Sequence, residues 1–441
     1  MNKNEHTHLQ KNIGLFAAFS TVMGTVIGAG VFFKVSSVTA STQSAGLSLL
    51  AWLAGGLLTI CAGLTSAELA SAIPVTGGAI KYLEVTYGKL TGFLLGWAQT
   101  LIYFPANIAA LSIIFGTQFT NLFHLKAGLI LPIAVICGAS ITGINLLGTK
   151  HGARLQSVAL IAKLIPIAVI IAFGLFAPSN VHLSLIPEHF TTSQTLTGFS
   201  GGLLSTLFAY DGWLGIGAIA GEMKNPKRDL PLAIDLGLTG IMVVYLGINL
   251  VFLKTLPISD LAGNLNAAST AAGQLFGNIG GKLVTIGILI SVYGALNGYT
   301  MTGMRIPYAM AKEDSLPIMS NHLSKLSRTA VPYVAGIVQL VIAGLMMIVG
   351  SFDLLTDMLI FVMWIFNVLI FYAVIKLRRT QPDLVRPYKV PLYPFLPVVA
   401  ILGGIFVLVT TIIDQPILAT TGIVVTLLGI PVYLVTKRKA S

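Results

Sequence analysis

Two apolar stretches of this chain are interrupted by short runs rich in glycine, and such interruptions expose backbone groups that bind charged ligands. The first is Val26-Ile27-Gly28-Ala29-Gly30-Val31-Phe32 and the second is Phe208-Ala209-Tyr210-Asp211-Gly212-Trp213. Each lies in a segment otherwise long enough to cross a bilayer. A broken helix leaves N–H groups free where one half starts and C=O groups free where the other half ends. Paired breaks of this kind are typical of a transporter's substrate site.

A zwitterion needs partners for both of its charges once water is removed, and the two breaks offer both kinds. We expect the N–H groups at the start of a helix to hold a carboxylate, and glycine to permit close approach of the backbone. These N–H groups belong to Ala29, Gly30 and Val31. Unpaired carbonyls suit an ammonium, and the candidates are Val26, Ile27, Phe208 and Asp211. The alternative for Gly28 and Gly30 is a close packing contact between helices.

The composition predicts an all-α polytopic membrane protein. Hydrophobic residues make up 55% of the chain, charged residues 9%, and the mean hydropathy is +0.88. The apolar runs are continuous, which excludes the alternating pattern of a membrane β-barrel. At ~20 residues per span, we place twelve transmembrane helices at 13–36, 44–72, 90–116, 128–147, 155–177, 195–221, 231–253, 270–311, 331–350, 353–376, 392–412 and 416–436.

The basic residues predict the orientation of these spans. With the N-terminus inside, twenty-one of the 26 Lys and Arg residues fall on the inner side. Four fall on the outer side of the membrane, namely Lys34, Lys126, Lys254 and Lys282, and Lys163 lies within a span. The positive-inside rule therefore places both termini in the cytoplasm. We expect the protein to lie in the lipid bilayer of the plasma membrane, which in a bacterium is the inner membrane.

Several function classes are excluded by what the sequence lacks. The net charge of +11 is spread over helix ends, so it does not indicate nucleic-acid binding. All seven histidines fall in tails or loops, and no metal-ligand spacing, nucleotide-binding loop or catalytic-serine motif occurs, so we predict no metal, no cofactor and no enzyme activity. Cys61 and Cys137 lie within spans and are predicted to be packing residues.

Motifs along nearly the whole chain resemble one superfamily. They are the first break; Ala67-Glu68-Leu69 with Ile73-Pro74-Val75-Thr76-Gly77-Gly78; the second break; Glu222-Met223-Lys224-Asn225-Pro226; and Asn297-Gly298 with Arg305. The chain resembles the amino acid–polyamine–organocation superfamily and, within it, the L-type amino acid transporter family, especially bacterial serine/threonine and alanine-serine-cysteine exchangers.

This resemblance implies a LeuT-like fold, in which two inverted repeats of five helices each contain one broken helix, the first and the sixth. The repeats would span 13–177 and 195–376, with two appended helices at 392–436. Residues 1–12 and 437–441 would be cytoplasmic tails.

The resemblance also implies roles for side chains near the second break. Phe208 resembles the family's gating aromatic. Tyr210 and Trp213 are candidate pocket residues, and Tyr245 is a candidate gate partner, with a packed aromatic as the alternative for each. A carboxylate at membrane depth, such as that of Asp211, is costly unless it is hydrated or paired. Three explanations for it are considered, in this order: it faces a water-filled vestibule, it bonds to a backbone donor, or it helps to attract the substrate ammonium.

Lys163 is the only basic residue that the span assignment leaves deep in the membrane. Resemblance to sodium-coupled members of the fold implies that its ammonium occupies their cation site, against carbonyls near Gly24 and polar groups such as Ser291. Transport would then be independent of sodium. A deprotonated lysine used for proton coupling and a lysine snorkelling to the interface are the alternatives.

These features together predict a sodium-independent exchanger of small neutral L-amino acids (alanine, serine, threonine, cysteine) that works by alternating access. A proton-coupled symporter is the nearest rival, and a membrane-embedded receptor or enzyme is a candidate from another class. Members of the family that pair with a single-span glycoprotein do so through a cysteine in the outer loop between the third and fourth helices. The corresponding loop here, around Gly116–Lys126, has no cysteine, so the resemblance implies no covalently linked heavy subunit. Glu68, and Glu222 with Arg228, are predicted to anchor an inner gate or a loop, with ordinary surface ion pairs as the alternative.

Overall fold

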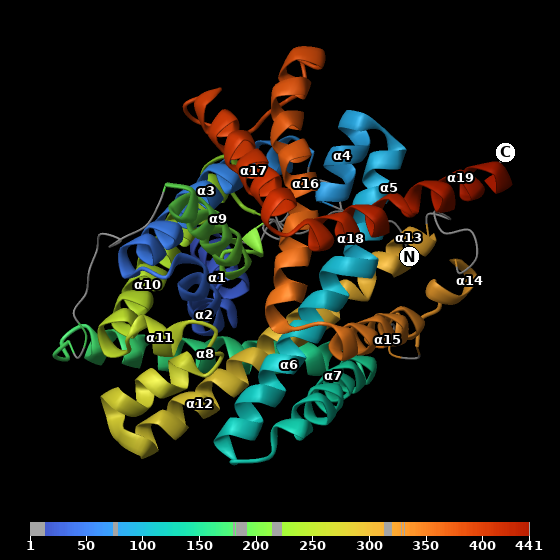
Figure 1. Ribbon diagram of the computed structural model, residues 1–441. Helices are drawn as coiled ribbons and strands as arrows, with labels where there is room; N and C mark the ends of the chain where they lie inside the picture. Colours follow the sequence, from blue (N-terminus) through green and yellow to red (C-terminus); the bar gives the residue numbers. More distant parts are fainter. Residues whose placement is uncertain are drawn as a thin grey trace.

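The structure is a computed structural model that describes residues 14–73, 78–179, 181, 192–213, 223–312, 320–327, 329 and 331–440. These ranges contain helices and no β-strand, so the all-α prediction is confirmed for them. A helix satisfies its own backbone hydrogen bonds, as a segment surrounded by lipid must. The main helices (Figure 1) are α1 (Leu15–Val26), α2 (Gly30–Thr42), α3 (Ala45–Ala72), α4 (Ala79–Tyr87), α5 (Lys89–Ala98), α6 (Phe104–Leu122), α7 (Ile130–Leu146), α8 (Thr149–Gly174), α9 (Thr192–Ala209), α10 (Pro226–Thr255), α12 (Ala267–Gly303), α13 (Arg305–Lys312), α15 (Tyr333–Val349), α16 (Phe352–Thr380), α17 (Phe395–Asp414), α18 (Pro416–Leu427) and α19 (Gly429–Ala440).

Four short elements complete the described chain. They are the π-helical turn η1 (Gln99–Tyr103), the 3-10 turn η2 (Ala127–Leu129), α11 (Ile258–Leu261) and α14 (Ser320–Leu323). The turn η1 lies between α5 and α6, within the third predicted span, and adds a bulge to it. Such bulges often occur at functional sites.

Helices lie within all twelve predicted ranges, and eight described segments are long and apolar enough to cross a membrane. Two further apolar helical stretches, Lys163–Gly174 and Tyr333–Val349, are shorter. Large apolar side chains such as Phe176, Val349 and Ile417 are more than four-fifths exposed, as expected for surfaces that face lipid. The number of twelve spans and the inverted repeat stay predictions.

The first predicted span is divided into two helices. Ile27, Gly28 and Ala29 separate α1 from α2, so the chain is broken where the glycines stand. The second break begins where α9 ends at Ala209, and a turn with Gly212 at φ 108° follows. A positive φ of this size strongly favours glycine. The predicted span continues to residue 221, but residues 214–222 lie outside the described part of the chain.

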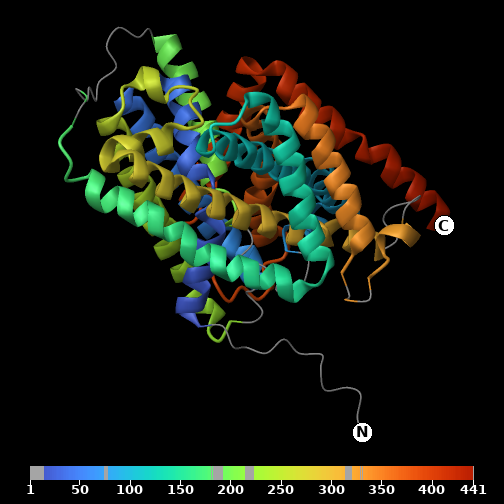
Figure 2. The same ribbon diagram turned by 90° about the horizontal axis from the view of Figure 1, so that it is seen from below.

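The eighth predicted span, 270–311, is not one straight helix. Gly277 has φ 71° inside α12, where the chain turns between a short first part and a long second part. A separate helix, α13, then begins at Arg305. The long part of α12 packs side by side with α8 (Figure 2), and a Cβ added at Gly294 would lie 2.1 Å from Ala159 Cβ. Small residues therefore allow these two helices to approach closely.

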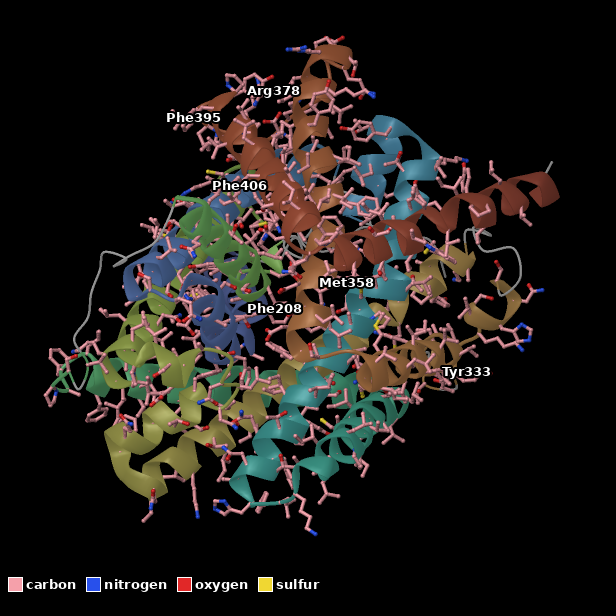
Figure 3. The ribbon with its side chains drawn as sticks, viewed as in Figure 1. Phe208, Tyr333, Met358, Arg378, Phe395 and Phe406 are labelled. Atoms are coloured by element: carbon pink, nitrogen blue, oxygen red, sulfur yellow. The ribbon has the colours of Figure 1, made fainter. Side chains whose placement is uncertain are left out.

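The helix α16 runs through the middle of the molecule in Figure 1. It contacts α3, α6, α9, α17 and α18. Arg378 lies near one end of α16, and Phe208 of α9 lies beside the other half (Figure 3). The helix α16 therefore connects the region of the breaks with the opposite end of the molecule.

Candidate functional site

The two breaks lie directly against each other. A Cβ added at Gly30 would lie 2.6 Å from the Cα of Ala209, a distance that real Cβ atoms do not reach. The helices α2 and α9 pack along each other from this point. Gly30 therefore serves a close helix contact, which was the alternative considered for it. A Cβ at Gly28 would have only the Val26 carbonyl oxygen within 4 Å, at 3.8 Å.

A single hydroxyl links the ends of the two broken helices. Tyr245 of α10 is fully buried, and its hydroxyl lies 3.1 Å from the carbonyl oxygen of Val26 and 3.0 Å from that of Ala209. These are terminal carbonyls of α1 and α9, which have no intrahelical partner. The side chain of Tyr245 thus satisfies acceptors on both breaks, a function that its position in the sequence does not reveal.

The predicted carboxylate ligands remain free for a partner. No hydrogen bond among the described residues uses the N–H groups of Ala29, Gly30 or Val31. The first bond after the break runs from the Phe32 N–H to the Ala29 carbonyl, at 3.0 Å. These N–H groups stand at the start of α2, where the helix dipole is positive. An anion at this place would find unpaired donors and a favourable field.

The predicted ammonium ligands differ in their present use. The Val26 carbonyl accepts from Tyr245, and the Phe208 carbonyl faces the Asp211 N–H at 3.3 Å. The carbonyls of Ile27 and Asp211 have no hydrogen bond among the described residues. Because a carbonyl oxygen has two lone pairs, all four retain capacity for a further donor.

The Asp211 side chain has a partner that the sequence analysis did not foresee. Its Oδ2 accepts a hydrogen bond from the hydroxyl of Tyr103, the last residue of η1. The ring of Tyr103 lies edge-on to that of Tyr299 from α12, with centroids 6.0 Å apart. The π-helical turn thus brings a phenol to a carboxylate at membrane depth, where an unpaired charge would be costly.

The other predicted aromatic residues pack against neighbouring helices. The Tyr210 hydroxyl donates to the Trp52 carbonyl at 3.0 Å, and its ring lies 5.0 Å from that of Tyr245. The ring of Trp213 stacks on Phe371 of α16 at 6.3 Å. Tyr210 is fully buried and Trp213 nearly so. These contacts favour structural packing for both side chains, the alternative considered for them.

The structure brings together two of the three residues of the predicted cation-site group. The ammonium of Lys163, which is buried in α8, donates to the carbonyl of Gly24 in α1. The Ser291 hydroxyl of α12 is buried and has no hydrogen-bond partner in the described part of the chain. Lys163 therefore ties α8 to the half of the first span that precedes the break.

A buried ion cluster next to Phe208 contains Lys34, which the sequence analysis counted on the outer side of the membrane. Lys34 lies in α2 and has no exposed surface. Its ammonium lies 3.0 Å from Asp357 Oδ1 and 3.2 Å from Asp353 Oδ1, both on α16. We call Lys34, Asp353 and Asp357 the Lys34 cluster. The two aspartates are spaced by four residues in an apolar segment, and this spacing was the available signal.

A second ion cluster lies at the other end of α16. Glu68 of α3 is buried, and its carboxylate accepts from Arg378 at 2.8 Å and from the N–H of Val390 at 2.8 Å. Arg386 Nε lies 3.4 Å from the same carboxylate. We call Glu68, Arg378 and Arg386 the Glu68 cluster. It anchors the segment after α16, as predicted for Glu68, whereas Glu222 lies outside the described residues.

Tyr388 lies in the segment that the Glu68 cluster anchors. Its backbone N–H donates to the Ser71 hydroxyl at 3.2 Å. Burial, and to a smaller extent the nearby carboxylates of Glu68 and Asp235, raise the pKa of the Tyr388 phenol above its ordinary value. The phenol therefore stays neutral beside Glu68.

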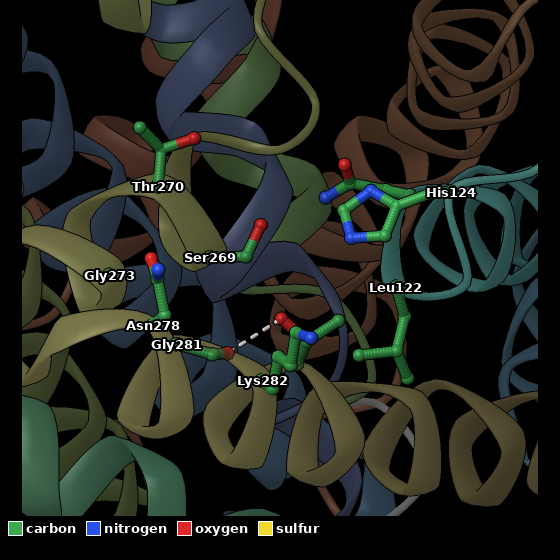
Figure 4. A pocket seen from close by; sticks show the side chains of 10 residues that line it. Leu122, His124, Ser269, Thr270, Gly273, Asn278, Gly281 and Lys282 are labelled. Atoms are coloured by element: carbon green, nitrogen blue, oxygen red, sulfur yellow. Dashed lines mark hydrogen bonds between the residues drawn. The ribbon is translucent and has the colours of Figure 1, made fainter.

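A polar cavity of about 320 Å³ lies elsewhere, between the end of α6 and the turn in α12 (Figure 4). Its lining includes Asn121, His124, Asn278 and Lys282, and the Thr285 hydroxyl bonds to the Gly281 carbonyl at its wall. None of its lining residues belongs to either break. The cavity therefore carries no argument about a ligand at the breaks.

Together, the apolar helices of the described residues and the contact between the two breaks indicate a membrane transport protein, and comparison with known proteins agrees. Residues 13–436 match the amino acid permease family, so the chain belongs to this family of the amino acid–polyamine–organocation superfamily. It is 42% identical to the serine/threonine exchanger SteT of Bacillus subtilis (strain 168), over 99% of both chains. It is 30% identical to b(0,+)-type amino acid transporter 1 of Rattus norvegicus, over 93% of this chain and 84% of the relative. The cystine/glutamate transporter of Homo sapiens is 29% identical, over 97% and 86%. The predicted resemblance is confirmed.

Proposed function

We propose that this amino acid permease is a sodium-independent exchanger of small neutral amino acids that works by alternating access around the two breaks. The observation that carries the proposal is the meeting of the breaks at Gly30 and Ala209, beside unused N–H groups. The geometry supports a site where backbone dipoles replace the hydration of a zwitterion.

In this proposal the substrate carboxylate binds the N–H groups of Ala29, Gly30 and Val31. The ammonium binds carbonyls at the ends of the preceding helices, with Ile27 and Asp211 the least occupied by other donors. Phe208 covers the site from one side. Gly28 leaves open space beside the break, which suits a close approach of the substrate to the backbone.

The relatives support the proposed substrate class. The similarity to the serine/threonine exchanger SteT extends over 99% of both chains, and the name of that protein supports serine and threonine as substrates here. Alanine and cysteine are comparable in size and charge. The cystine/glutamate transporter is named for larger amino acids, so the preference for small ones proposed here rests on the likeness to SteT.

The buried Lys163 supports sodium independence. Its ammonium already donates to the Gly24 carbonyl, and a fixed positive charge there disfavours binding of a metal cation. By the positive-inside rule both termini face the cytoplasm, and no covalently attached subunit is needed. Cys61 and Cys137, the only cysteines, lie in α3 and α7 and are not paired.

The exchange hypothesis is tested with purified protein in liposomes. We expect uptake of labelled serine to require serine, threonine or alanine inside, and to be unaffected when sodium is replaced by choline. Uptake into empty liposomes driven by a pH gradient would instead support a proton-coupled symporter. That second candidate is favoured by one observation, since the only hydrogen-bond acceptor that the described structure gives Lys163 is an uncharged carbonyl, which leaves the amine able to release its proton.

The position of the substrate is tested with Gly28→Ala. A methyl group at Gly28 has room among the protein atoms, so we expect normal stability but at least a tenfold weaker serine affinity. Gly143→Ala is the matched control, because Gly143 of α7 also has open space and lies in no break. Unchanged affinity in Gly28→Ala would place the substrate elsewhere.

A further inference from the structure

The Lys34 cluster combines a fully buried ammonium with two carboxylates of unequal exposure. The side chain of Asp357 is 12% exposed and that of Asp353 is 44% exposed. The hydroxyl of Ser37, one turn after Lys34, donates to Asp353 Oδ1. The cluster holds one positive and two negative formal charges, all on α2 and α16, and Asp357 has a further side-chain hydrogen bond with Gln415, which follows α17.

The same ammonium lies against two aromatic rings. It is 5.5 Å from the ring centroid of Phe208 and 5.2 Å from that of Phe352, within range of a cation–π interaction. The two rings meet edge to face at 5.8 Å. Phe208 immediately precedes Ala209, the residue that contacts Gly30. The Lys34 ammonium therefore contacts the ring of the residue that directly precedes the contact between the breaks.

The contacts of the Lys34 ammonium join α16 to α2, which begins at the first break, and to α9, which ends at the second. Lys34 and Ser37 belong to α2, Phe208 to α9, and Asp353, Asp357 and Phe352 to α16. The ties between them use side chains, so a shift of α2 and α9 against α16 would release them without unfolding a helix. No other described element supplies a partner to the Lys34 ammonium.

A charged tie of this kind suits reversible closure. A buried ion pair contributes little net stability, because desolvation of the charges offsets their attraction. When the contact opens, water hydrates the ammonium and the carboxylates again, so the open form is not heavily penalised. An apolar contact of the same area would favour the closed form more strongly.

We propose that Lys34 is a positioning residue for Phe208. Held by Asp353 and Asp357, its ammonium keeps the phenylalanine ring in place on one side of the breaks, and this latch opens each time that side admits substrate. The proposal rests on the alternating-access function proposed above. Loss of the latch shifts the population toward the form open on the Lys34 side, which raises the apparent affinity on that side and lowers it on the other.

The test compares the two faces of the protein in liposomes of known orientation. In Lys34→Met, we expect the ratio of the serine KM on the Lys34 side to that on the opposite side to fall at least about fivefold, the lower end of typical coupling between sites. Lys34→Arg keeps the charge, and we expect it to restore most of the parent ratio. Lys254→Met is the matched control, because the hydrogen bonds of its ammonium within the described residues go to the carbonyls of Leu175 and Ala177, away from the Lys34 cluster.

A second readout does not depend on transport. A cysteine introduced by Ile27→Cys, with Cys61 and Cys137 replaced by serine, is probed with a membrane-impermeant thiol reagent. We expect Lys34→Met to increase labelling from the Lys34 side and to decrease it from the other. If exchange fails in the parent protein but this asymmetry appears, the proposed function is wrong and the latch stands.

Two outcomes would overturn the latch. One is a Lys34→Met protein whose KM ratio and labelling equal those of the parent. The other is an equal loss on both faces, which indicates a purely structural role. If Lys34→Met does not fold, Asp353→Asn weakens the same cluster at its more exposed carboxylate, and the shift must then have the same sign and a smaller size.

Discussion

The two ends of α16 are both fastened by buried ion clusters, yet the clusters are opposite in composition. The Lys34 cluster has one cation and two carboxylates, whereas the Glu68 cluster has one carboxylate and two guanidinium groups. Arg378 follows Asp357 by 21 positions, which at ~1.5 Å of rise per residue separates the clusters by about 30 Å. The same helix therefore carries two independent charged ties.

The partners of each cluster distinguish their roles. Glu68 also accepts from the backbone N–H of Val390, and the neighbouring Ser71 bonds to the backbone of Tyr388. These bonds hold a main-chain segment in place. The Lys34 cluster bonds through side chains, and it joins α16 to α2, the helix that begins at the first break. The comparison indicates that one cluster is an anchor and the other a latch.

The largest effect is expected from Glu68→Gln. The substitution leaves Arg378 and Arg386 without their charge partner in a buried place, which typically costs about 3–5 kcal/mol. We expect a marked loss of thermal stability in detergent, measured by tryptophan fluorescence, with an unchanged ratio of the KM values on the two faces.

The matched control is Glu84→Gln, which breaks the half-exposed pair with Lys81. Pairs of this exposure contribute about 0–1 kcal/mol, so this variant should melt close to the parent. If Glu68→Gln is no less stable than Glu84→Gln, the Glu68 cluster is not an anchor and the comparison fails.

The two aspartates of the Lys34 cluster should differ from each other. Asp357 is the more buried of the two. Asp357→Asn removes its charge-assisted bond to Lys34 and should destabilise the protein by about 1.5–3 kcal/mol. Asp353 is much more exposed, so Asp353→Asn should cost less than about 1 kcal/mol. Thermal melting of both variants checks the order, and a reversed order would mean that Asp353 is the main partner of Lys34.

The breaks could be predicted from the sequence because they are local signals. Glycines and an aspartate within long apolar runs mark places where a helix is interrupted, and α1 and α9 end at those places. A lone charge in an apolar segment likewise marked Lys163 as a residue with a role, whereas its contact with the first span was implied by the resemblance to sodium-coupled members. In each case the unfavourable residue itself carries the information.

The partners across the fold could not be predicted in this way. Tyr103 and Asp211 are more than a hundred residues apart, and only helix packing brings them together. The sequence also did not reveal how far the helix after the first break extends beyond residue 36, where the first predicted span ends. In the structure α2 continues to Thr42, since the hydroxyls of Ser36 and Thr39 bond to carbonyls of their own helix and remain buried.

The smallest effects are expected from two serines, and they separate the clusters most clearly. Ser37→Ala removes the hydroxyl bond to Asp353, and Ser71→Ala removes a bond to the Tyr388 backbone. Each bond contributes about 1 kcal/mol, so neither variant should unfold. Because Ser37 belongs to the latch, we expect its loss to shift the KM ratio in the same direction as Lys34→Met, by less than fivefold. Because Ser71 belongs to the anchor, its loss should lower the melting temperature slightly and leave the ratio unchanged. A ratio that moves in Ser71→Ala would show that the two ends of α16 are coupled.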